Sequence, residues 1–394
     1  MKVNRRAITP FISIILLISF IGGLVINMQY ISWELFAIST FGVSMSVLGI
    51  ITSLGELGYS LIHPLTGKLS DIRGRKIILA LSSIFFIIGA SMLAIVFNFI
   101  FLIPAVIIFR IGSAIFDPGF YAAVDESVLA ERRGRGFGLN FSMRVGGGVL
   151  AGILAGLIGL NLGYPILFVV IDGISAILLL VVILFKPVNN QSTDTVSTVN
   201  SVSKAKIDGD NRIRLRIYVI GAMDAFSWAT FYPIFTGMLN IHLHLNLLQI
   251  GFANSLQLLL MMIILPLFGL FSDRYGRKKF FILSEGLGVF TILGFLFSTN
   301  YTSILLLQLP MAAVGATYVV SFYPLLMDNT PYTRRAEIIG WATAIRGLTA
   351  FPAPFIGGLI FDILGYEATL LTSTILVVLT LSLIFSLLPG RAVN

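Results

Sequence analysis

Long apolar stretches separated by short polar connections repeat from one end of the chain to the other. Runs of about 18 apolar residues or more have the length that crosses a lipid bilayer as a helix. The bilayer core offers no water to the backbone, and continuous runs favour helices over the ten-residue alternation of a barrel. We therefore expect an all-α integral membrane protein with twelve transmembrane helices, spanning residues 11–30, 43–64, 77–97, 100–121, 137–158, 164–185, 215–238, 247–268, 279–298, 302–324, 338–359 and 366–388.

One connection differs from the others in length and composition. Residues 186–214 are polar, rich in Ser, Thr and Asn, and too poor in apolar residues to fold alone. We expect a flexible cytosolic linker here, between an N-terminal six-helix bundle at 1–185 and a C-terminal six-helix bundle at 215–394. The first apolar run follows basic residues, as in a signal peptide, but it lacks a small-residue cleavage site, so we expect it to be retained.

The placement of positive charge predicts the orientation of the chain. Apolar residues make up 57% of the sequence and charged residues 11%, with a net charge of +8 and no cysteine. All Lys and Arg residues except Arg110, Arg144 and Arg346 lie in the termini, in the linker, or in the loops after the second, fourth, eighth and tenth helices. Such loops face the cytoplasm. We expect a multi-pass protein of the plasma membrane with both termini cytoplasmic, whose basic residues meet lipid headgroups rather than nucleic acid.

A charged motif occurs twice in this apolar chain. The segment GKLSDIRGRK at 67–76 returns as GLFSDRYGRKK at 269–279, an offset of 202 residues. The same offset relates Glu126 to Asp328, Arg133 to Arg335 and Arg144 to Arg346. A register kept over that distance indicates an internal duplication. Because each unit has an even number of helices, the two halves are expected to be parallel repeats.

The repeated motif resembles the signature loop of the major facilitator superfamily, between the second and third helices of each half. It is met here at Gly67, Asp71, Gly74, Arg75 and Lys76, and again at Gly269, Asp273, Gly276, Arg277 and Lys278. Helix number and linker position agree with the twelve-helix transporters of that family. The resemblance implies a secondary transporter that works by alternating access, and we expect it to act as a monomer.

The two loops are expected to act as latches at the cytoplasmic ends of the halves. Glycine permits the tight turn of a short loop. Charge contacts that exist in one state only would hold the outward-open form and release in the inward-open form. Cations that merely set topology would not require the matched glycines and aspartates. The expected contacts are Arg75 with Glu126, Arg277 with Asp328, and Asp71 with a helix N-terminus or Arg133, with Asp273 and Arg335 as counterparts.

Ionisable residues inside the expected helices are candidates for substrate or proton binding, because a charge at mid-bilayer costs about 2.5 kcal/mol or more. Arg110 resembles the fourth-helix signature arginine of proton-coupled members; the alternative is a structural ion pair with Glu56 or Asp117. Glu56, Asp117 and Asp224 are candidate proton carriers, with structural hydrogen bonding as the alternative. The remaining candidates are Arg144 and Arg346, for a gate, the cytosolic surface or substrate contact, whereas Asp172 and Glu285 are expected to be structural.

The family's central path runs chiefly between the first, fourth, seventh and tenth helices, which implies that Asn27, Gln29, Tyr30 and Tyr232 line it. No phosphate-binding loop or hydrolase motif occurs, and His242 and His244 lack further ligands, so we expect no enzymatic activity, cofactor or metal. We expect gradient-driven transport of a small organic solute with protons or another ion. Proton-linked export of an amphipathic compound, uptake of an organic anion or sugar by symport or uniport, and a non-transporting sensor remain alternatives.

Overall fold

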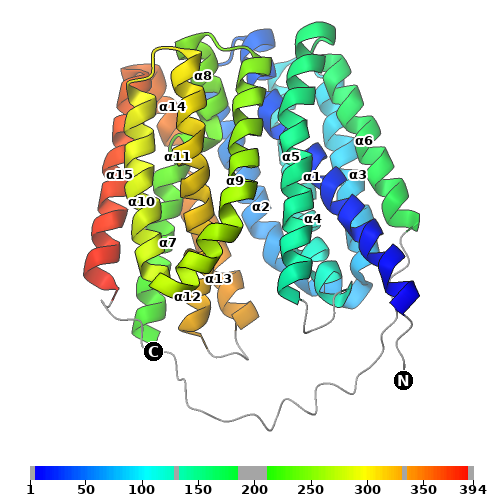
Figure 1. The fold of residues 1–394 in the computed structure, drawn as a ribbon. Helices are drawn as coiled ribbons and strands as arrows, with labels where there is room; N and C mark the ends of the chain where they lie inside the picture. Colours follow the sequence, from blue (N-terminus) through cyan, green and yellow to red (C-terminus); the bar gives the residue numbers. More distant parts are fainter. Residues whose placement is uncertain (1–4, 128–132, 185–210, 331–334, 389–394) are drawn as a thin grey trace.

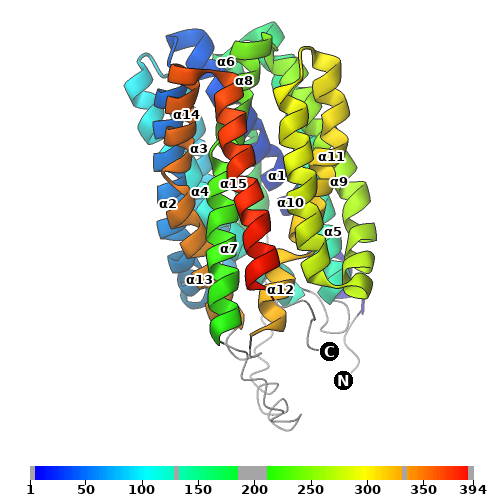
Figure 2. The same cartoon turned by 90° about the vertical axis from the view of Figure 1, so that its left-hand side faces the viewer.

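The computed structural model describes residues 5–127, 133–184, 211–330 and 335–388. Their helices run side by side as one tall bundle, with the two halves of the sequence next to each other (Figures 1 and 2). The first half contains α1 (Arg5–Phe41), α2 (Met45–Arg73), α3 (Arg75–Ala94), η1 (Phe99–Phe101), α4 (Leu102–Ser127), α5 (Arg133–Leu162) and α6 (Tyr164–Leu184). The second half contains α7 (Asn211–Ala229), η5 (Tyr232–Ile234), α8 (Phe235–Leu243), α9 (Leu247–Tyr275), α10 (Arg277–Leu296), α11 (Tyr301–Val319), α12 (Phe322–Asp328), α13 (Arg335–Ala350), α14 (Ala353–Leu364) and α15 (Tyr366–Leu387).

The helices have the length and the outer surface that a bilayer requires. Among the described residues, eleven helical segments are long and apolar enough to cross a membrane, and the remaining expected span falls on α7, η5 and α8. Large apolar side chains such as Leu306, Phe290 and Phe385 are exposed on the outside. Helices that satisfy their own backbone behind an apolar exterior are stable in lipid. The prediction of an all-α integral membrane protein is confirmed.

The sequence repeat reappears in the capping and turn residues. Ser44 and Asn246, which are 202 positions apart, begin α2 and α9 by accepting hydrogen bonds from the backbone N–H three residues later. Asn98 and Asn300, again one repeat apart, cap η1 and α11. The turns repeat as well, with φ of 86° and 97° at Gly74 and Gly276, and of 84° and 91° at Gly163 and Gly365. Equivalent turns therefore connect equivalent helices in the two halves.

Three expected spans of the second half are not continuous helices. They are interrupted after Ala229, after Val319 and after Ala350, close to Pro233, Pro324 and Pro352. Proline has no N–H to donate to the carbonyl four residues earlier. The carbonyl of Val320, which Pro324 leaves without its helical donor, instead accepts a hydrogen bond from Ser272 Oγ at 2.9 Å. Neighbouring helices thus supply the partners that make broken helices tolerable in a membrane.

The first helix is longer than its predicted span of 11–30, because α1 continues to Phe41. The additional turns contain Trp33 and the acidic Glu34. Both side chains are buried, at 3% and 1% exposure. The Glu34 carboxylate accepts a hydrogen bond from the Gly237 N–H of α8 at 3.1 Å, so contact with the other half makes a helix possible here.

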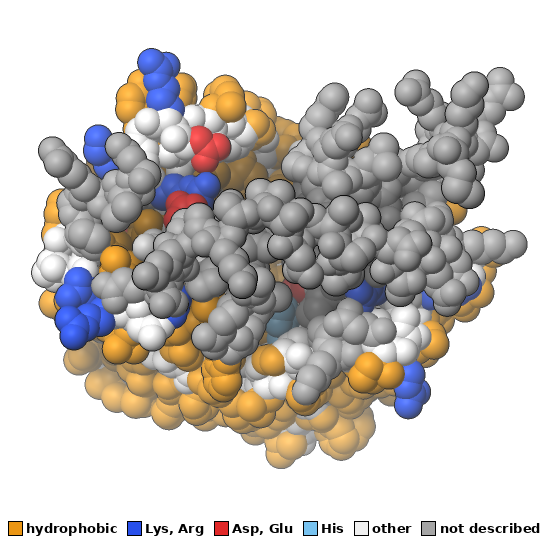
Figure 3. Space-filling model, turned by 90° about the horizontal axis from the view of Figure 1, so that it is seen from below, with side chains coloured by type: hydrophobic (Ala, Val, Ile, Leu, Met, Phe, Trp, Pro, Cys, Tyr) orange, Lys and Arg blue, Asp and Glu red, His pale blue; other side chains and the backbone are white. Residues whose placement is uncertain are grey.

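The two halves touch closely at one end of the bundle. We call the end where α1 begins and α15 ends the terminal face, and the opposite end the far face (Figure 1). A Cβ at Gly152 of α5 would lie 2.1 Å from the Gly251 carbonyl oxygen of α9, and one at Gly49 of α2 would lie 2.2 Å from the Pro354 carbonyl oxygen of α14. These contacts are one repeat apart and lie toward the far face. On the terminal face, Lys and Arg side chains of both halves are exposed at several places (Figure 3).

Candidate functional site

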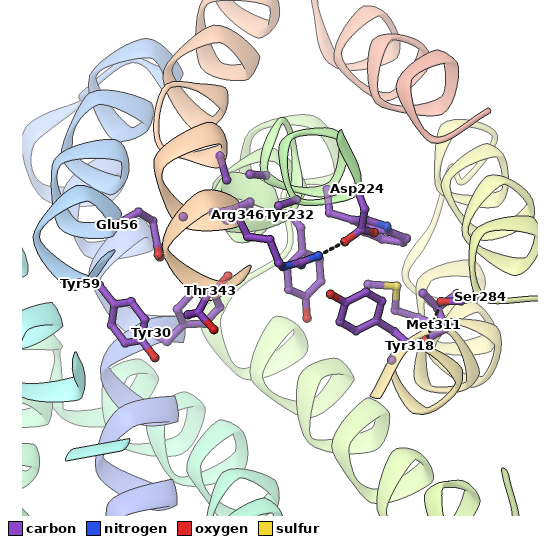
Figure 4. Close-up of a pocket in the computed structure, with 18 of the residues that line it drawn as sticks. Tyr30, Glu56, Tyr59, Asp224, Tyr232, Ser284, Met311, Tyr318, Thr343 and Arg346 are labelled. Carbon is purple, nitrogen blue, oxygen red and sulfur yellow. Dashed lines mark hydrogen bonds and ion pairs between the residues drawn. The ribbon is translucent and has the colours of Figure 1, made fainter. Parts of the chain in front are cut away.

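A cavity of about 630 Å³ lies between the two halves near mid-bundle. Tyr30 of α1 and Glu56, Tyr59 and Ser60 of α2 come from the first half, and α7, α9, α11 and α13 supply most of the rest (Figure 4). The lining extends toward the terminal face as far as Tyr323. This volume is typical of sites for small organic molecules.

The second half contributes an ion pair directly to this cavity. Arg346 Nη1 of α13 lies 2.6 Å from Asp224 Oδ2 of α7, and it also donates to the Gly221 carbonyl oxygen at 3.0 Å (Figure 4). The guanidinium carbon lies 5.0 Å from the ring centre of Tyr318 and 4.7 Å from that of Phe322. Pairing, hydrogen bonding and ring contact together offset the cost of holding this arginine inside the membrane.

Sequence analysis did not place Glu285 in this cluster. We expected a structural residue on a peripheral helix, but its carboxyl on α10 lies beside that of Asp224 and is 0% exposed. The available signal was an acidic residue in the middle of an apolar helix, in the segment FILSEGLGVF. α10 itself supplies no partner for Glu285, and only the packing of α7 beside α10 brings Asp224 near it.

The first half holds two further ion pairs, mostly behind the cavity wall. Arg110 pairs with Glu56, and its guanidinium carbon lies 5.1 Å from the ring centre of Tyr59. Arg144 Nη1 lies 2.7 Å from Asp117 Oδ1, and the Tyr59 hydroxyl donates to Asp117 Oδ2 at 2.8 Å. Of these residues, Glu56 and Tyr59 line the cavity. The structural alternative for Arg110, an ion pair with Glu56, is therefore the arrangement observed.

Of the residues expected to line the central path, two line the cavity and two do not. Tyr30 and Tyr232 line the cavity, and Tyr232 accepts a hydrogen bond from Gln257 Nε2 at 3.4 Å. Asn27 donates to the Gly23 carbonyl oxygen of its own helix at 2.8 Å, and Gln29 is buried. Neither is among the cavity-lining residues. The apolar pattern predicts that α1 is a helix, but it does not predict which face of α1 lines the cavity.

The repeated loop motif forms a charged cluster in the second half. Arg277 Nη1 lies 2.7 Å from Asp328 Oδ1 and donates to the Pro324 carbonyl oxygen at 2.7 Å, while Nη2 lies 3.6 Å from Asp273. Lys278 Nζ donates to the Leu388 carbonyl oxygen at 2.5 Å. Arg277 thus joins the end of α12 to the start of α10.

In the first half, Arg75 Nη1 donates to Ser70 Oγ at 2.8 Å, and Lys76 Nζ donates to the Ile183 carbonyl oxygen at 2.5 Å. Lys76 and Lys278 therefore make equivalent contacts with the last helix of their own half. Other parts of the expected latches lie outside the described part of the structure, namely Gly67 and the side chains of Asp71, Glu126, Arg133 and Arg335.

Two acidic residues join the halves at the far face, and sequence analysis singled out neither. Asp362 of α14 accepts hydrogen bonds from the N–H groups of Met45 and Ser46, at 3.0 and 2.8 Å. These are the first two residues of α2, whose N–H groups have no partner within the helix. Glu34 of α1 does the same for the third residue of α8, Gly237. Each half therefore caps a helix of the other.

A two-lobed bundle of membrane-spanning helices, with a solute-sized cavity between its lobes and buried ion pairs within each lobe, is the arrangement of a membrane transporter. A model of the Major Facilitator Superfamily matches residues 15–213 and 217–394. The chain belongs to the major facilitator superfamily.

Relatives and solved structures agree with this family. The multidrug resistance protein MdtG of Proteus mirabilis is 22% identical over 332 residues, which cover 81% of this chain and 80% of MdtG. The class H tetracycline resistance protein of Pasteurella multocida is 27% identical over 155 residues, or 39% of this chain and 38% of that protein. The crystal structure of a D-xylose–proton symporter superposes with a TM-score of 0.74 at 17% identity, covering 96% of this chain and 98% of that one.

A second solved structure shares the fold. A bacterial homologue of the human lysosomal transporter Spinster, in an inward-facing and unoccupied conformation, gives a TM-score of 0.76 at 13% identity. The alignment covers 97% of both chains. At this identity the likeness establishes a shared fold.

Proposed function

We propose that this chain is a proton-coupled secondary transporter that exports an amphipathic organic compound across the plasma membrane. The observation that carries the proposal is the cavity itself. Its wall combines the rings of Tyr30, Tyr59, Trp228 and Tyr318 with buried charged groups. Aromatic and apolar walls with a few placed polar groups suit an amphipathic solute.

Proton coupling is supported by the carboxyl groups of Glu56 and Asp224, which line the same cavity. A carboxyl group that reaches a solute cavity can exchange a proton with water or compete with the solute for its arginine partner. Gain and loss of a proton are then linked to the state of that partner. The resistance proteins among the relatives favour export as the direction.

The close contacts at the far face and the cavity lining that reaches toward the terminal face support an inward-facing state. The terminal face then lies in the cytosol, as the positive-inside rule predicts. Alternating access then requires the contacts at Gly152 and Gly49 to open while the terminal ends close. The pair of Arg277 and Asp328 lies within the second half and is already formed here. It is therefore proposed to hold the terminal ends of α10 and α12 together, rather than to form only in the outward-facing state as expected from the sequence.

Uptake of an organic anion is the second candidate, and Arg346 in the cavity wall is the observation that favours it. Its charge is already balanced by Asp224, so an anion must displace that carboxylate to use it. Export of an amphipathic compound does not require displacement of Asp224 from Arg346, so we prefer export as the proposed function.

A reconstitution experiment tests the proposed function. The protein is placed in liposomes that contain a pH-sensitive dye, and pooled drugs and metabolites are screened for solute-dependent proton flux. A gradient of two pH units supplies about 2.7 kcal/mol per proton, enough to accumulate a coupled solute about 100-fold. Solute flux that is indifferent to this gradient would contradict proton coupling and indicate a uniporter or another ion.

A further inference from the structure

The carboxyl group of Glu285 is buried in the second half without a counter-ion of its own. Its residue is 0% exposed, and the neighbouring Asp224 is 1% exposed. Asp224 lines the cavity, whereas Glu285 is not among the lining residues. Glu285 therefore lies behind Asp224 as seen from the cavity.

The surroundings of Glu285 contain fewer positive charges than negative ones. α7 contributes Asp224 and Trp228, α13 contributes Arg346, and α11 contributes Tyr318 to this group. Tyr323 of α12 lies near Arg346 and Tyr318. Arg346 already pairs with Asp224 Oδ2 at 2.6 Å, so two carboxyl groups share one guanidinium.

The hydrogen bonds of the cluster are also incomplete. Within the described residues, Asp224 Oδ1, both carboxyl oxygens of Glu285 and the Tyr318 hydroxyl are buried without a hydrogen bond of normal geometry. A carboxylate can only accept hydrogen bonds, whereas a neutral carboxylic acid can also donate one. A single proton between the two carboxyl groups would supply the missing donor. It would also bring the charge of the three groups to zero.

We propose that Asp224 and Glu285 form a carboxyl pair that holds one shared proton, which makes Glu285 a further proton site of the transporter. This inference rests on the proposed proton coupling and adds a residue that does not touch the cavity. When the proton leaves, it passes from Glu285 by way of Asp224 to the cavity water, and the cluster changes from net neutral to one negative charge. Uptake is the reverse. Movement of Arg346 away from Asp224 would favour retention of the proton.

Trp228 offers a direct readout that needs no transported solute, because it lies next to Glu285. The chain has three tryptophans, and replacing Trp33 and Trp341 by Phe leaves Trp228 as the sole fluorophore. We expect its emission in detergent-solubilised protein to change with pH as the pair titrates. Glu285→Gln should abolish that change. Asp172→Asn is the matched control, because Asp172 is also an acidic residue in a membrane helix but bonds Ser91 instead, and it should leave the change intact.

A second variant, Glu285→Met, keeps the test decisive if Glu285→Gln does not fold, since Met has similar length and no proton to exchange. Persistence of the full pH response in either folded Glu285 variant would overturn the proposal, as would a wild-type emission that is independent of pH.

The liposome assay separates this proposal from the proposed function. If wild-type flux follows the pH gradient and Glu285→Gln has the same proton-to-solute ratio and the same Trp228 response, the shared proton is wrong and proton coupling stands. If no flux follows the gradient but the Trp228 response depends on Glu285, the carboxyl pair stands and proton coupling is wrong. Support for both requires a Glu285-dependent response and a proton-to-solute ratio that falls in Glu285→Gln.

Discussion

The guanidinium of Arg346 bonds in several directions at once at the wall of the cavity. It meets Asp224 and the Gly221 carbonyl with one nitrogen, and it lies against the rings of Tyr318 and Phe322. A planar, delocalised cation can do this, whereas a lysine ammonium is a compact point charge that stacks poorly on rings. The residue type therefore matters here beyond its charge.

Arg346→Lys is expected to slow solute transport by about 10- to 100-fold. A hydrogen bond to a charged group contributes about 1.5–3 kcal/mol, and each 1.4 kcal/mol corresponds to about a factor of ten. Gradient-driven uptake into liposomes measures the effect. Arg274→Lys is the control, because Arg274 is an exposed arginine that lies against the ring of Tyr275. Equal rates for both variants would rule out a specific role for Arg346.

Sequence analysis named Asp224 and Arg346 but not their pairing. The two residues are 122 positions apart, and only the packing of α13 on α7 brings them together. For the same reason, sequence analysis did not place Glu285 beside Asp224, which lies on another helix. For Arg110, sequence analysis named both Glu56 and Asp117 as possible partners, and packing selects Glu56. The sequence identifies which residues are ionisable, but the packing of the helices decides where their side chains point.

At the scale of elements, apolar length predicted where the helices lie but not where they break. The interruptions near Pro324 and Pro352 depend on partners that replace lost backbone bonds, as Ser272 does for Val320. The turns of the loop motif were the easiest local structure to predict, because the glycines with positive φ and the cations recur at the same spacing in both copies.

Charge reversal at Arg277 and Asp328 tests the proposed latch. Arg277→Asp and Asp328→Arg should each impair transport about two- to five-fold, and the double variant should recover part of the loss. The expected coupling is about 0.2–1 kcal/mol, because both side chains are partly exposed. The double-mutant cycle is measured as initial transport rates in liposomes. Strictly additive losses would show that the pair is not a functional unit.

The glycine contacts at the far face predict a second effect at the element scale. Gly152→Leu places a side chain where the Gly251 carbonyl oxygen lies, so the halves must separate there. Overpacking costs about 1–3 kcal/mol, which shifts a two-state equilibrium about 5- to 150-fold.

The chain contains no cysteine, so an added Ala253→Cys, buried near the far face, reports this opening by thiol labelling. Gly173→Leu on α6 is the control, because a Cβ there meets no atom within 4 Å. Labelling that is the same in both variants would show that this contact does not limit opening.

The whole molecule consists of two repeated halves that contribute differently to the cavity. The equivalent arginines, Arg144 and Arg346, both pair with aspartates, but one pairs with α4 behind the wall and the other with α7 in the cavity. The second half also supplies most of the lining. Symmetry therefore sets the packing of the halves, while the chemistry of the cavity is concentrated in one of them.

The two acidic residues that cap a helix of the other half at the far face, Asp362 and Glu34, also break the symmetry of the repeat. Asp362 and Glu34 have no equivalents under the repeat, because Leu160 and Thr236 stand at those positions. Each accepts N–H groups at the start of a helix in the other half, where a negative charge is also favoured by the helix dipole. These contacts join the two halves at the far face, so opening of that face in the proposed transport cycle would break them.

Asp362→Ala is expected to shift the protein toward the outward-facing state. Loss of a helix cap costs about 0.5–2 kcal/mol, which corresponds to a population shift of about 2- to 30-fold. In the Ala253→Cys background, labelling by an impermeant reagent added outside intact cells should rise by that factor, because the far face is proposed to lie outside. Glu367→Ala removes an acidic residue from the same face, on α15, and should leave labelling unchanged. Unchanged labelling in Asp362→Ala would mean that Asp362 does not help to hold the far face closed.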